Sequence, residues 1–284
     1  MNYKVLYNPL AGKADDTSFH GELTKAFEGD TLEFYDITKT DYAQFFASLK
    51  EGEGVIIVGG DGTINRFVND TAELNITAPL YYYAAGTGND FWMDIGKAKG
   101  DKPVLLAPYI KDLPTVTVNG KNYKFINGVG YGIDGYCCEV GDAQKAAGNT
   151  DVNYTSIAIK GLLFHYKPAD AEITVDGVTK KYKKVWIAPT MNGRLYGGGM
   201  MPTPAQDRLN EERTLSVCVF HGSGKLKTLM IFPSLFKGEH IKKQKYVEVL
   251  SGKNVTVKFS KPCALQIDGE TILNVTEYTA KSAK

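Results

Sequence analysis

The segment from Val55 to Asn65 constrains the fold more than any other part of this chain. A run of aliphatic residues, Val55–Val58, leads directly into the turn Gly59-Gly60-Asp61-Gly62-Thr63, and residues with helical spacing follow. A continuous apolar run is typical of a strand that is buried on both faces of a helix-covered parallel sheet. Glycines allow a close backbone approach, and the first amides and the dipole of the next helix favour an anion. The segment therefore predicts an α/β sheet with a phosphate-binding turn.

The front part of the chain repeats this alternation of strand and helix. Repeated βα units of this kind indicate an open, mostly parallel sheet. Asp41 is an acidic residue at the expected start of the second helix, where it would act as a cap. Strands are expected at Lys4–Tyr7, Leu32–Ile37, Val55–Val58 and Leu80–Ala84, and helices at Ser18–Phe27, at Asp41–Leu49 and around Ile64, Phe67 and Val68.

Beyond residue 114 the pattern becomes β-rich and antiparallel. Alternating segments flank Asn119-Gly120, and the same pattern returns around Asp176-Gly177, which are strong hairpin signals. We predict two domains, an α/β nucleotide-binding domain over residues 1–114 and a β-rich domain over residues 115–284. Whether the residues after Val275 return to the first domain is left open. Further strands are expected at Val247–Leu250, Val255–Phe259 and Leu265–Ile267, a single helix near Thr155–Phe164, and a buried strand carrying Cys137 and Cys138.

Composition excludes several classes of protein. The 284 residues are 43% hydrophobic and 23% charged, which is globular rather than disordered or collagenous. No stretch reaches the roughly 18 apolar residues that a membrane-spanning helix needs. The four cysteines, two of them adjacent, argue against a disulfide framework, and the apolar run at the N-terminus is too short for a signal peptide. We therefore expect a cytoplasmic protein.

The charge is distributed unevenly although the net charge is only +1. Residues 1–114 hold 10 Lys/Arg and 17 Asp/Glu, a balance of −7, whereas residues 115–284 hold 23 and 15, a balance of +8. The basic runs Lys180–Lys184 and Lys242–Lys245 are usually interpreted as a solvated face, but each Lys near an anionic membrane contributes about 1 kcal/mol. Transient contact with such a membrane is therefore a candidate interaction. No RNA-binding motif or helix-turn-helix is visible, so nucleic acid is not an expected partner.

Two further loops are expected to lie beside the glycine-rich turn, because loops at the carboxyl ends of parallel strands meet over one crevice. They are Asn8-Pro9-Leu10-Ala11-Gly12-Lys13 and Gly86-Thr87-Gly88-Asn89-Asp90-Phe91. The turn lacks the lysine of a P-loop and the spacing of a dinucleotide fingerprint. Asp61 would repel a phosphate unless a metal ion or a substrate hydroxyl lies between them. Together these loops predict a nucleotide site.

These three motifs resemble the landmarks of the diacylglycerol-kinase catalytic family, which includes soluble bacterial lipid kinases and the sphingosine kinases. The resemblance continues in Gly130-x-Gly132-x-Asp134, which is similar to the glycine-rich strand of the family. Gly197-Gly198-Gly199 with Pro204-Ala205 is similar to its glycine loop, and Asp268-Gly269-Glu270 to its near-terminal acidic motif. NAD kinases and phosphofructokinases share the motif at Gly59–Thr63, but the ordered set is specific.

The resemblance implies an ATP- and Mg²⁺-dependent lipid kinase with an NAD kinase-like α/β domain and a C-terminal antiparallel β-sandwich. ATP would lie in the cleft between them, with lipid entering on the sandwich side. Asp61 and Glu270 would be catalytic, Glu270 as general base on the lipid hydroxyl, and Asp61, Asp134 and Asp268 would organise Mg²⁺. Without the resemblance, Asp134 and Asp268-Gly269-Glu270 are ordinary turn residues, and Lys13 is as readily a surface lysine. By motif position the ATP-binding residues would be Asn8, Lys13, Thr38, Gly59, Gly60, Asp61, Gly62, Thr63, Asn65, Gly86, Thr87 and Asn89.

Several positions depart from the pattern of the family. Arg66 stands where Glu is usual, Trp92-Met93 where Ala-Arg is usual, and Glu212-Arg213 nearest the place of an expected Asp-Gly, which brings a structural Mg²⁺ there into question. Diacylglycerol is the first expected acceptor, which would place the enzyme in phospholipid biosynthesis at the inner face of the membrane. Two alternatives remain: a soluble-substrate kinase of the NAD-kinase type and a non-catalytic nucleotide-binding regulator. A homodimer is also left open.

Overall fold

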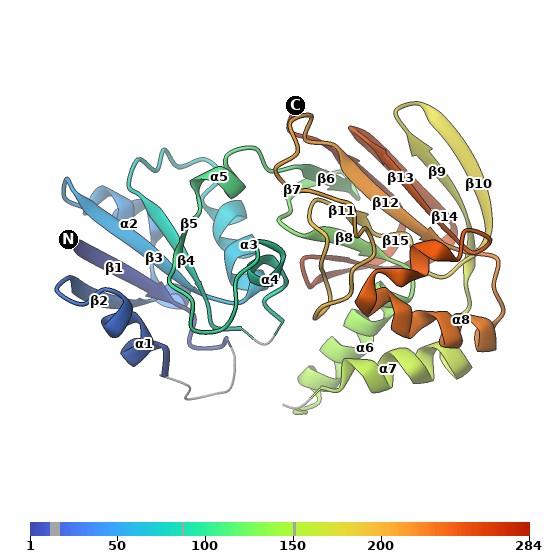
Figure 1. Cartoon of the computed structure of the whole chain (residues 1–284), viewed down its shortest axis with the longest axis horizontal. Coiled ribbons are helices and arrows are strands. Elements are labelled where there is room, and N and C mark those ends of the chain that lie inside the picture. Colours follow the sequence, from blue (N-terminus) through green and yellow to red (C-terminus); the bar gives the residue numbers. More distant parts are fainter. Residues whose placement is uncertain (12–17, 87, 150–151) are drawn as a thin grey trace. The chain divides into compact units, whose positions relative to one another are not determined.

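A computed structural model describes residues 1–11, 18–86, 88–149 and 152–284 of the chain. It divides the chain into two compact units, Met1–Asp112 and Leu113–Lys284 (Figure 1). This division lies within two residues of the boundary that the sequence predicts. Within the described residues, no helix is long and apolar enough to cross a membrane.

Unit 1 is an α/β domain built on a five-stranded sheet of order β2-β1-β3-β4-β5. The first four strands are parallel, and β5 runs antiparallel to β4. The mostly parallel sheet that the sequence predicts is therefore confirmed. The strands are β1 (Asn2–Tyr7), β2 (Thr31–Asp36), β3 (Glu53–Gly59), β4 (Leu80–Ala84) and β5 (Val104–Leu105), and the helices are α1 (Ser18–Ala26), η1 (Ile37–Lys39), α2 (Tyr42–Ala47), α3 (Asp61–Asp70), α4 (Asp90–Asp94) and α5 (Ala107–Ile110).

Local sequence signals account for these elements. Every residue of β3 is buried, as the continuous apolar run predicts. Asp41 caps α2, because its side chain accepts a hydrogen bond from the Gln44 N–H at 3.0 Å. On one face of the sheet Ile56 and Val58 pack against Leu23 of α1 in a buried cluster. The rigid sheet holds the loops at its carboxyl edge in fixed places.

Unit 2 is an antiparallel β-sandwich with helices on its surface. The long strand β14 pairs with β9 through Val255–Phe259 and with β8 through Leu265–Ile267, so it joins the β9–β10 ribbon to the rest of the sheet. Its core includes Tyr131, Val217 and Tyr278. The strands are β6 (Thr115–Val118), β7 (Lys121–Lys124), β8 (Gly128–Tyr131), β9 (Ala169–Val175), β10 (Val178–Val185), β11 (Thr190–Met191), β12 (Leu215–Phe220), β13 (Val247–Gly252), β14 (Asn254–Ile267) and β15 (Glu270–Lys281).

The turn signals of this unit are confirmed. Asn119 and Gly120 have φ of 49° and 75°, and Asp176 and Gly177 have φ of 47° and 85°. Positive φ at both central residues is the conformation of a two-residue hairpin turn that matches the twist of the strands. The last strand, β15, pairs with β14 and β6, so the final residues belong to the sheet of unit 2.

The prediction of a single helix in this unit is wrong, and so is the buried strand at Cys137 and Cys138. Both cysteines lie on α6. This helix contains Gly135 and Gly141, which weaken its sequence signal. Gly135 is explained by packing, because a Cβ there would lie 2.0 Å from the Ala264 carbonyl oxygen of β14. The helical elements of unit 2 are α6 (Ile133–Ala146), α7 (Tyr154–Lys160), the π-helical turn η2 (Gly161–His165), α8 (Lys225–Ile231), η3 (Phe232–Lys237) and η4 (Glu239–Lys242).

Candidate active site

The loops after β1, β2, β3 and β4 lie at one edge of the unit 1 sheet. The register pairs Tyr7 with Asp36 and Val58, and Gly59 with Ala84, so the four parallel strands end side by side. Most of the predicted ATP-binding residues lie at these ends or within the next turns: Asn8, Thr38, Gly59, Gly60, Asp61, Gly62, Thr63, Asn65, Gly86 and Asn89. Lys13 and Thr87 lie outside the described residues.

The glycines of two motifs pack backbone against backbone. A Cβ on Gly86 would lie 2.4 Å from the Cα of Gly60, and a Cβ on Gly60 would lie 3.1 Å from the Cα of Gly86. A Cβ on Gly59 would lie 2.4 Å from Thr63 Oγ1. A side chain on Gly86 would displace the backbone of the Gly60 turn, and one on Gly59 would displace the Thr63 side chain of the same turn. The glycines thus bring the turn after β3 and the turn after β4 into direct contact.

Asp61 ties the same two loops together. Its Oδ2 accepts a hydrogen bond from the Asp90 N–H at 2.7 Å, and its Oδ1 accepts one from the Phe91 N–H at 2.9 Å. These amides belong to the first turn of α4, where the helix dipole favours a negative charge. The contact gives the carboxylate a partner that the sequence does not reveal. Each carboxylate oxygen keeps further acceptor capacity for a water or a metal ion.

Two amide side chains brace the remaining loops. Asn8 Nδ2 donates to Thr63 Oγ1 at 2.8 Å, which fixes the loop after β1 to α3. Asn89, at φ 53°, accepts from the Gly86 N–H at 3.0 Å and donates to the Gly86 carbonyl at 2.7 Å. Thr38 donates its N–H and its hydroxyl to Asp36 Oδ1 at 2.9 and 2.6 Å. These contacts brace the described residues of the turns, and the N-terminus of α3 beside them is suited to an anion.

In unit 2 the predicted residue Asp134 lies in the first turn of α6 and is buried. Its Oδ2 accepts a hydrogen bond from the Tyr196 hydroxyl at 3.1 Å. Its Oδ1 has no hydrogen-bond partner among the described residues. A Cβ on Gly130 would lie 2.2 Å from Asp134 Oδ2 and 2.4 Å from Gln266 Nε2, so this glycine leaves the space that both side chains occupy. A buried carboxylate oxygen without a partner fits a site that takes a cation or its bound water.

Burial raises the pKa of Asp134 from 3.8 to about 6. Between these values the native state holds more protons than the unfolded state, so the free energy of unfolding falls as the pH rises through this range. We expect Asp134→Asn to be more stable than the wild type at pH 7.5 by about 1–3 kcal/mol, since it removes a buried charge. The gain should shrink below pH 6 and disappear near pH 4. Urea unfolding in EDTA at pH 7.5, 5 and 4 measures it, and a variant less stable than the wild type at pH 7.5 would contradict it.

Asp268 and Glu270 occupy the turn between β14 and β15. Asp268 has a φ of 47°, and its carboxylate accepts hydrogen bonds from the N–H groups of Ile126, Asn127 and Gly128 at 2.5–2.9 Å. These contacts anchor the start of β8, and they use much of the acceptor capacity of the carboxylate, because Oδ1 accepts two of the N–H groups and Oδ2 accepts one. Metal binding by Asp268 thus stays a prediction without support from its contacts. Glu270 is exposed at the first position of β15.

Sequence reasoning missed Tyr196, the hydrogen-bond donor to Asp134. Tyr196 directly precedes the glycine loop and exchanges two backbone hydrogen bonds with Met200, at 3.0 and 3.1 Å. The residues between them, Gly197–Gly199, have φ of 62°, 82° and 98°, which L side chains rarely adopt. The glycine motif thus forms a tight turn that fixes the position of Tyr196. An aromatic residue next to a run of glycines is the signal that could have identified it.

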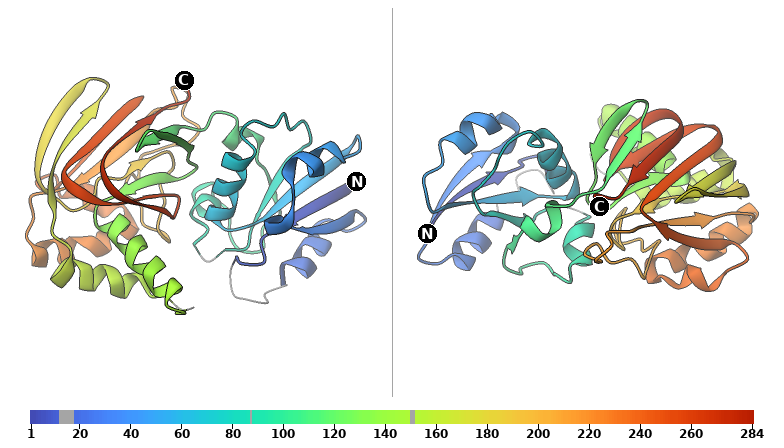
Figure 2. Two further views of the ribbon diagram at one scale, coloured as in Figure 1. Left: turned by 180° about the vertical axis from the view of Figure 1, so that it is seen from behind. Right: turned by 90° about the horizontal axis from the view of Figure 1, so that it is seen from above.

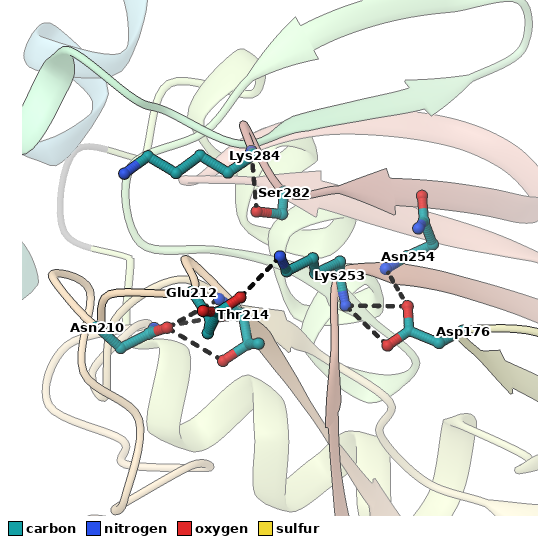
Figure 3. A network of polar contacts seen from close by, with 8 residues as sticks. All are labelled: Asp176, Asn210, Glu212, Thr214, Lys253, Asn254, Ser282 and Lys284. Carbon is teal, nitrogen blue, oxygen red and sulfur yellow. Dashed lines mark hydrogen bonds and ion pairs between the residues drawn. The ribbon is translucent and has the colours of Figure 1, made fainter.

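The residues near Glu212 do not fit a structural Mg²⁺. Figure 3 shows Lys253 between this loop and Asp176, and the Lys253 ammonium lies 2.8 Å from the Glu212 carboxylate. The ammonium lowers the pKa of Glu212 and already balances its charge. Asn210 Oδ1 accepts a hydrogen bond from the Thr214 N–H at 2.9 Å, so it too has a protein partner. In the described part of the chain, no three His, Cys, Asp or Glu side chains gather as a metal site.

The comparisons with known proteins agree with this arrangement. Residues 2–113 match the family described as the diacylglycerol kinase catalytic domain, and residues 127–280 match the YegS C-terminal NAD kinase beta sandwich-like domain. The two matches follow the two units of the structure. The second match covers more than half of the chain, so the chain belongs to the family with the YegS C-terminal NAD kinase beta sandwich-like domain, and its first unit matches the diacylglycerol kinase catalytic domain.

Individual relatives support the same assignment. A diacylglycerol kinase of Mycobacterium tuberculosis is 25% identical over 257 residues, which cover 84% of this chain and 79% of the relative. A diacylglycerol kinase of Bacillus subtilis is 24% identical over 278 residues, with 94% and 89% covered. The crystal structure of a diacylglycerol kinase from Bacillus anthracis superimposes with a TM-score of 0.59 at 18% identity, covering 99% of this chain and 94% of that one. This structural likeness confirms the fold.

Proposed function

We propose that the chain is an ATP-dependent lipid kinase that transfers the γ-phosphoryl group to a lipid hydroxyl, with diacylglycerol as the first candidate acceptor. The observation that carries the proposal is the loop pair of unit 1, in which Gly60 packs on Gly86 and Asp61 binds the first turn of α4. This pair fixes the N-terminus of α3 and the closely packed glycine backbone beside it, as phosphate binding requires. The relatives named above are diacylglycerol kinases, which supports a lipid acceptor.

In this proposal the residues of unit 1 bind ATP. The first amides of α3 would donate to its phosphates, with the Asn8–Thr63 pair holding the adjacent loop in place. Lys13, Thr38 and Thr87 remain candidates for the same site through the family motifs. Phosphoryl transfer depends mainly on positioning and on charge stabilisation, so an ordered set of loops is the main contribution that the protein can make.

The residues of unit 2 would act on the metal and the acceptor. Asp134, whose Oδ1 is buried without a partner among the described residues, fits the binding of Mg²⁺ or of its water. When bound, Mg²⁺ would neutralise charge that develops on the phosphates. Glu270 lies at the first position of β15, and through the family motif its carboxylate would accept the proton of a lipid hydroxyl. We propose that the enzyme is cytoplasmic and meets its lipid at the inner membrane face. The proposal does not depend on a homodimer.

A thin-layer assay with labelled ATP, Mg²⁺ and a panel of acceptors tests the proposal. The panel contains diacylglycerol, monoacylglycerol, sphingosine and NAD, and reactions without protein or without Mg²⁺ are the controls. We expect a labelled phospholipid from diacylglycerol. Labelling of NAD without any lipid would instead favour the NAD-kinase type, which shares the Gly59–Thr63 motif. ATP binding without transfer to any acceptor would favour a nucleotide-binding regulator.

A further inference from the structure

The basic run on β10 is a poor candidate for a membrane-binding surface. Three of its lysines form ion pairs with carboxylates of neighbouring strands: Lys180 with Glu248 at 2.5 Å, Lys181 with Glu172 at 2.9 Å, and Lys183 with Asp170 at 2.7 Å. These carboxylates offset the positive charge that an anionic surface would attract. The run therefore behaves as a solvated face with paired charges, which is the usual interpretation of such a sequence.

A different part of unit 2 combines apolar exposure with positive charge. In α8 the side chains of Leu226 and Met230 are 73% and 74% exposed, although a soluble helix normally presents polar residues to water. They lie four residues apart and so share one face of the helix. Phe236 in η3 is 45% exposed. Residues 222–238 contain three lysines, Lys225, Lys227 and Lys237, and no Asp or Glu.

The neighbouring element α7–η2 has the same character. Phe164 is 70% exposed and Ile159 is 40% exposed, and residues 152–169 contain two lysines, Lys160 and Lys167, and no Asp or Glu. Lys225 Nζ donates a hydrogen bond to the Leu163 carbonyl at 2.7 Å, so α8 and η2 are in contact. In the left view of Figure 2 the yellow-green α7 and the orange α8 lie at the same end of unit 2.

The buried faces of α7–η2 and of α8–η3 pack into the core of unit 2. Ile157 and Leu162 on one side, and Ile231 and Leu235 on the other, are buried in a common hydrophobic cluster. The exposed apolar side chains are therefore not part of a core that has opened. They are presented outward by two anchored helical segments, which is the form of a surface with a specific partner.

We propose that this surface docks on an anionic lipid bilayer, with the apolar side chains entering the interface and the lysines contacting lipid headgroups. Binding of this kind depends on the apolar area buried and on attraction to anionic lipid, and each lysine adds about 1 kcal/mol. The inference rests on the proposed function, since a lipid kinase must reach an acceptor in a membrane. We call this surface the α7–α8 face: Ile159, Lys160, Phe164, Lys225, Leu226, Lys227, Met230, Phe236 and Lys237.

Vesicle sedimentation without ATP or diacylglycerol tests the docking. The vesicles are phosphatidylcholine alone or mixed with phosphatidylglycerol, at low and high salt. We expect the wild type to bind the anionic vesicles and to dissociate as salt rises. The double variant Leu226→Ser/Met230→Ser should bind at least about 10-fold more weakly, because it removes most of the apolar insertion. At low salt, the affinity of Lys227→Ser/Lys237→Ser for the anionic vesicles should be about 10- to 30-fold lower than that of the wild type.

Matched controls come from the β9–β10 ribbon. Val178→Ser removes an apolar side chain that is 67% exposed, and Lys181→Ser/Lys183→Ser removes two lysines of the paired run. We expect both to bind within about twofold of the wild type, because these residues lie outside the docking surface. The inference would be overturned if the controls lost as much affinity for anionic vesicles as the face variants. It would also be overturned if Leu226→Ser/Met230→Ser lost no affinity, or if the wild type did not bind these vesicles.

Activity on a dispersed acceptor separates this inference from the proposed function. With short-chain diacylglycerol in detergent, Leu226→Ser/Met230→Ser should keep the turnover of the wild type, since its loss concerns the bilayer and not the reaction. If turnover in detergent falls as far as vesicle binding, the docking role is wrong. If vesicle binding follows the expected order but no lipid is phosphorylated, the docking surface stands and the kinase proposal fails.

Discussion

Replacing Asp61 by Asn is expected to lower the rate of phosphoryl transfer at least about 100-fold and to weaken ATP binding, while the protein stays folded. The Asp61 carboxylate accepts hydrogen bonds from the Asp90 and Phe91 N–H groups, and Asn can offer one acceptor only. Its NH₂ group would face the second N–H and push the loop after β4 away from Gly60. A displacement of about 1 Å in such a loop is enough to cost about 100-fold. Steady-state assays with labelled ATP, ATP titration and circular dichroism measure the three quantities.

The matched control is Asp70→Asn, which removes one negative charge from the other end of the same helix. Asp70 is exposed at the last position of α3, so we expect its turnover and ATP affinity to stay within about twofold of the wild type. Asp61→Ala should lose turnover as completely as Asp61→Asn. Near-normal turnover by either Asp61 variant would contradict the kinase proposal, because the loop pair that carries it would then be dispensable.

Local patterns predict unit 1 well because its elements depend on short-range signals. The apolar run Val55–Val58, the cap at Asp41 and the helical spacing of Ile64, Phe67 and Val68 all act within a few residues. The Asn119-Gly120 and Asp176-Gly177 turns are predicted for the same reason. By contrast, α6 is missed because its glycines weaken the pattern, and its stability depends on close packing against β14.

The candidate site shows the same limit. The motifs give the order of the site residues, but not their partners. Asp61 binds backbone N–H groups that lie 29 and 30 residues away in the sequence. Because every residue except proline carries such a donor, the pattern of side chains does not predict which N–H groups bind Asp61. Tyr196 and Asp134 meet across 62 residues. Asp268 is both a hairpin turn residue, as its sequence indicates, and an anchor for the start of β8, which only the folded structure reveals.

Glu270→Gln is expected to lower turnover by about 10²- to 10⁴-fold and to leave the dissociation constant of ATP within about twofold, because a general base contributes to the chemical step. The residues assigned to ATP belong to unit 1, whereas Glu270 begins β15 in unit 2. Gln keeps the size of the side chain but cannot accept the proton of the hydroxyl. ATP titration, together with turnover on diacylglycerol in detergent, separates binding from chemistry.

The matched control for this prediction is Glu277→Gln on the same strand. Glu277 is exposed and lies 3.8 Å from Lys258, a surface pair whose loss should change little. We expect Glu277→Gln to keep turnover within about twofold of the wild type. If Glu270→Gln weakens ATP binding as much as it lowers turnover, Glu270 is not the base, and its carboxylate instead contributes to nucleotide binding. If both variants behave like the wild type, proton transfer from the acceptor depends on another group, and Asp134, the buried carboxylate of the same unit, is the next residue to test.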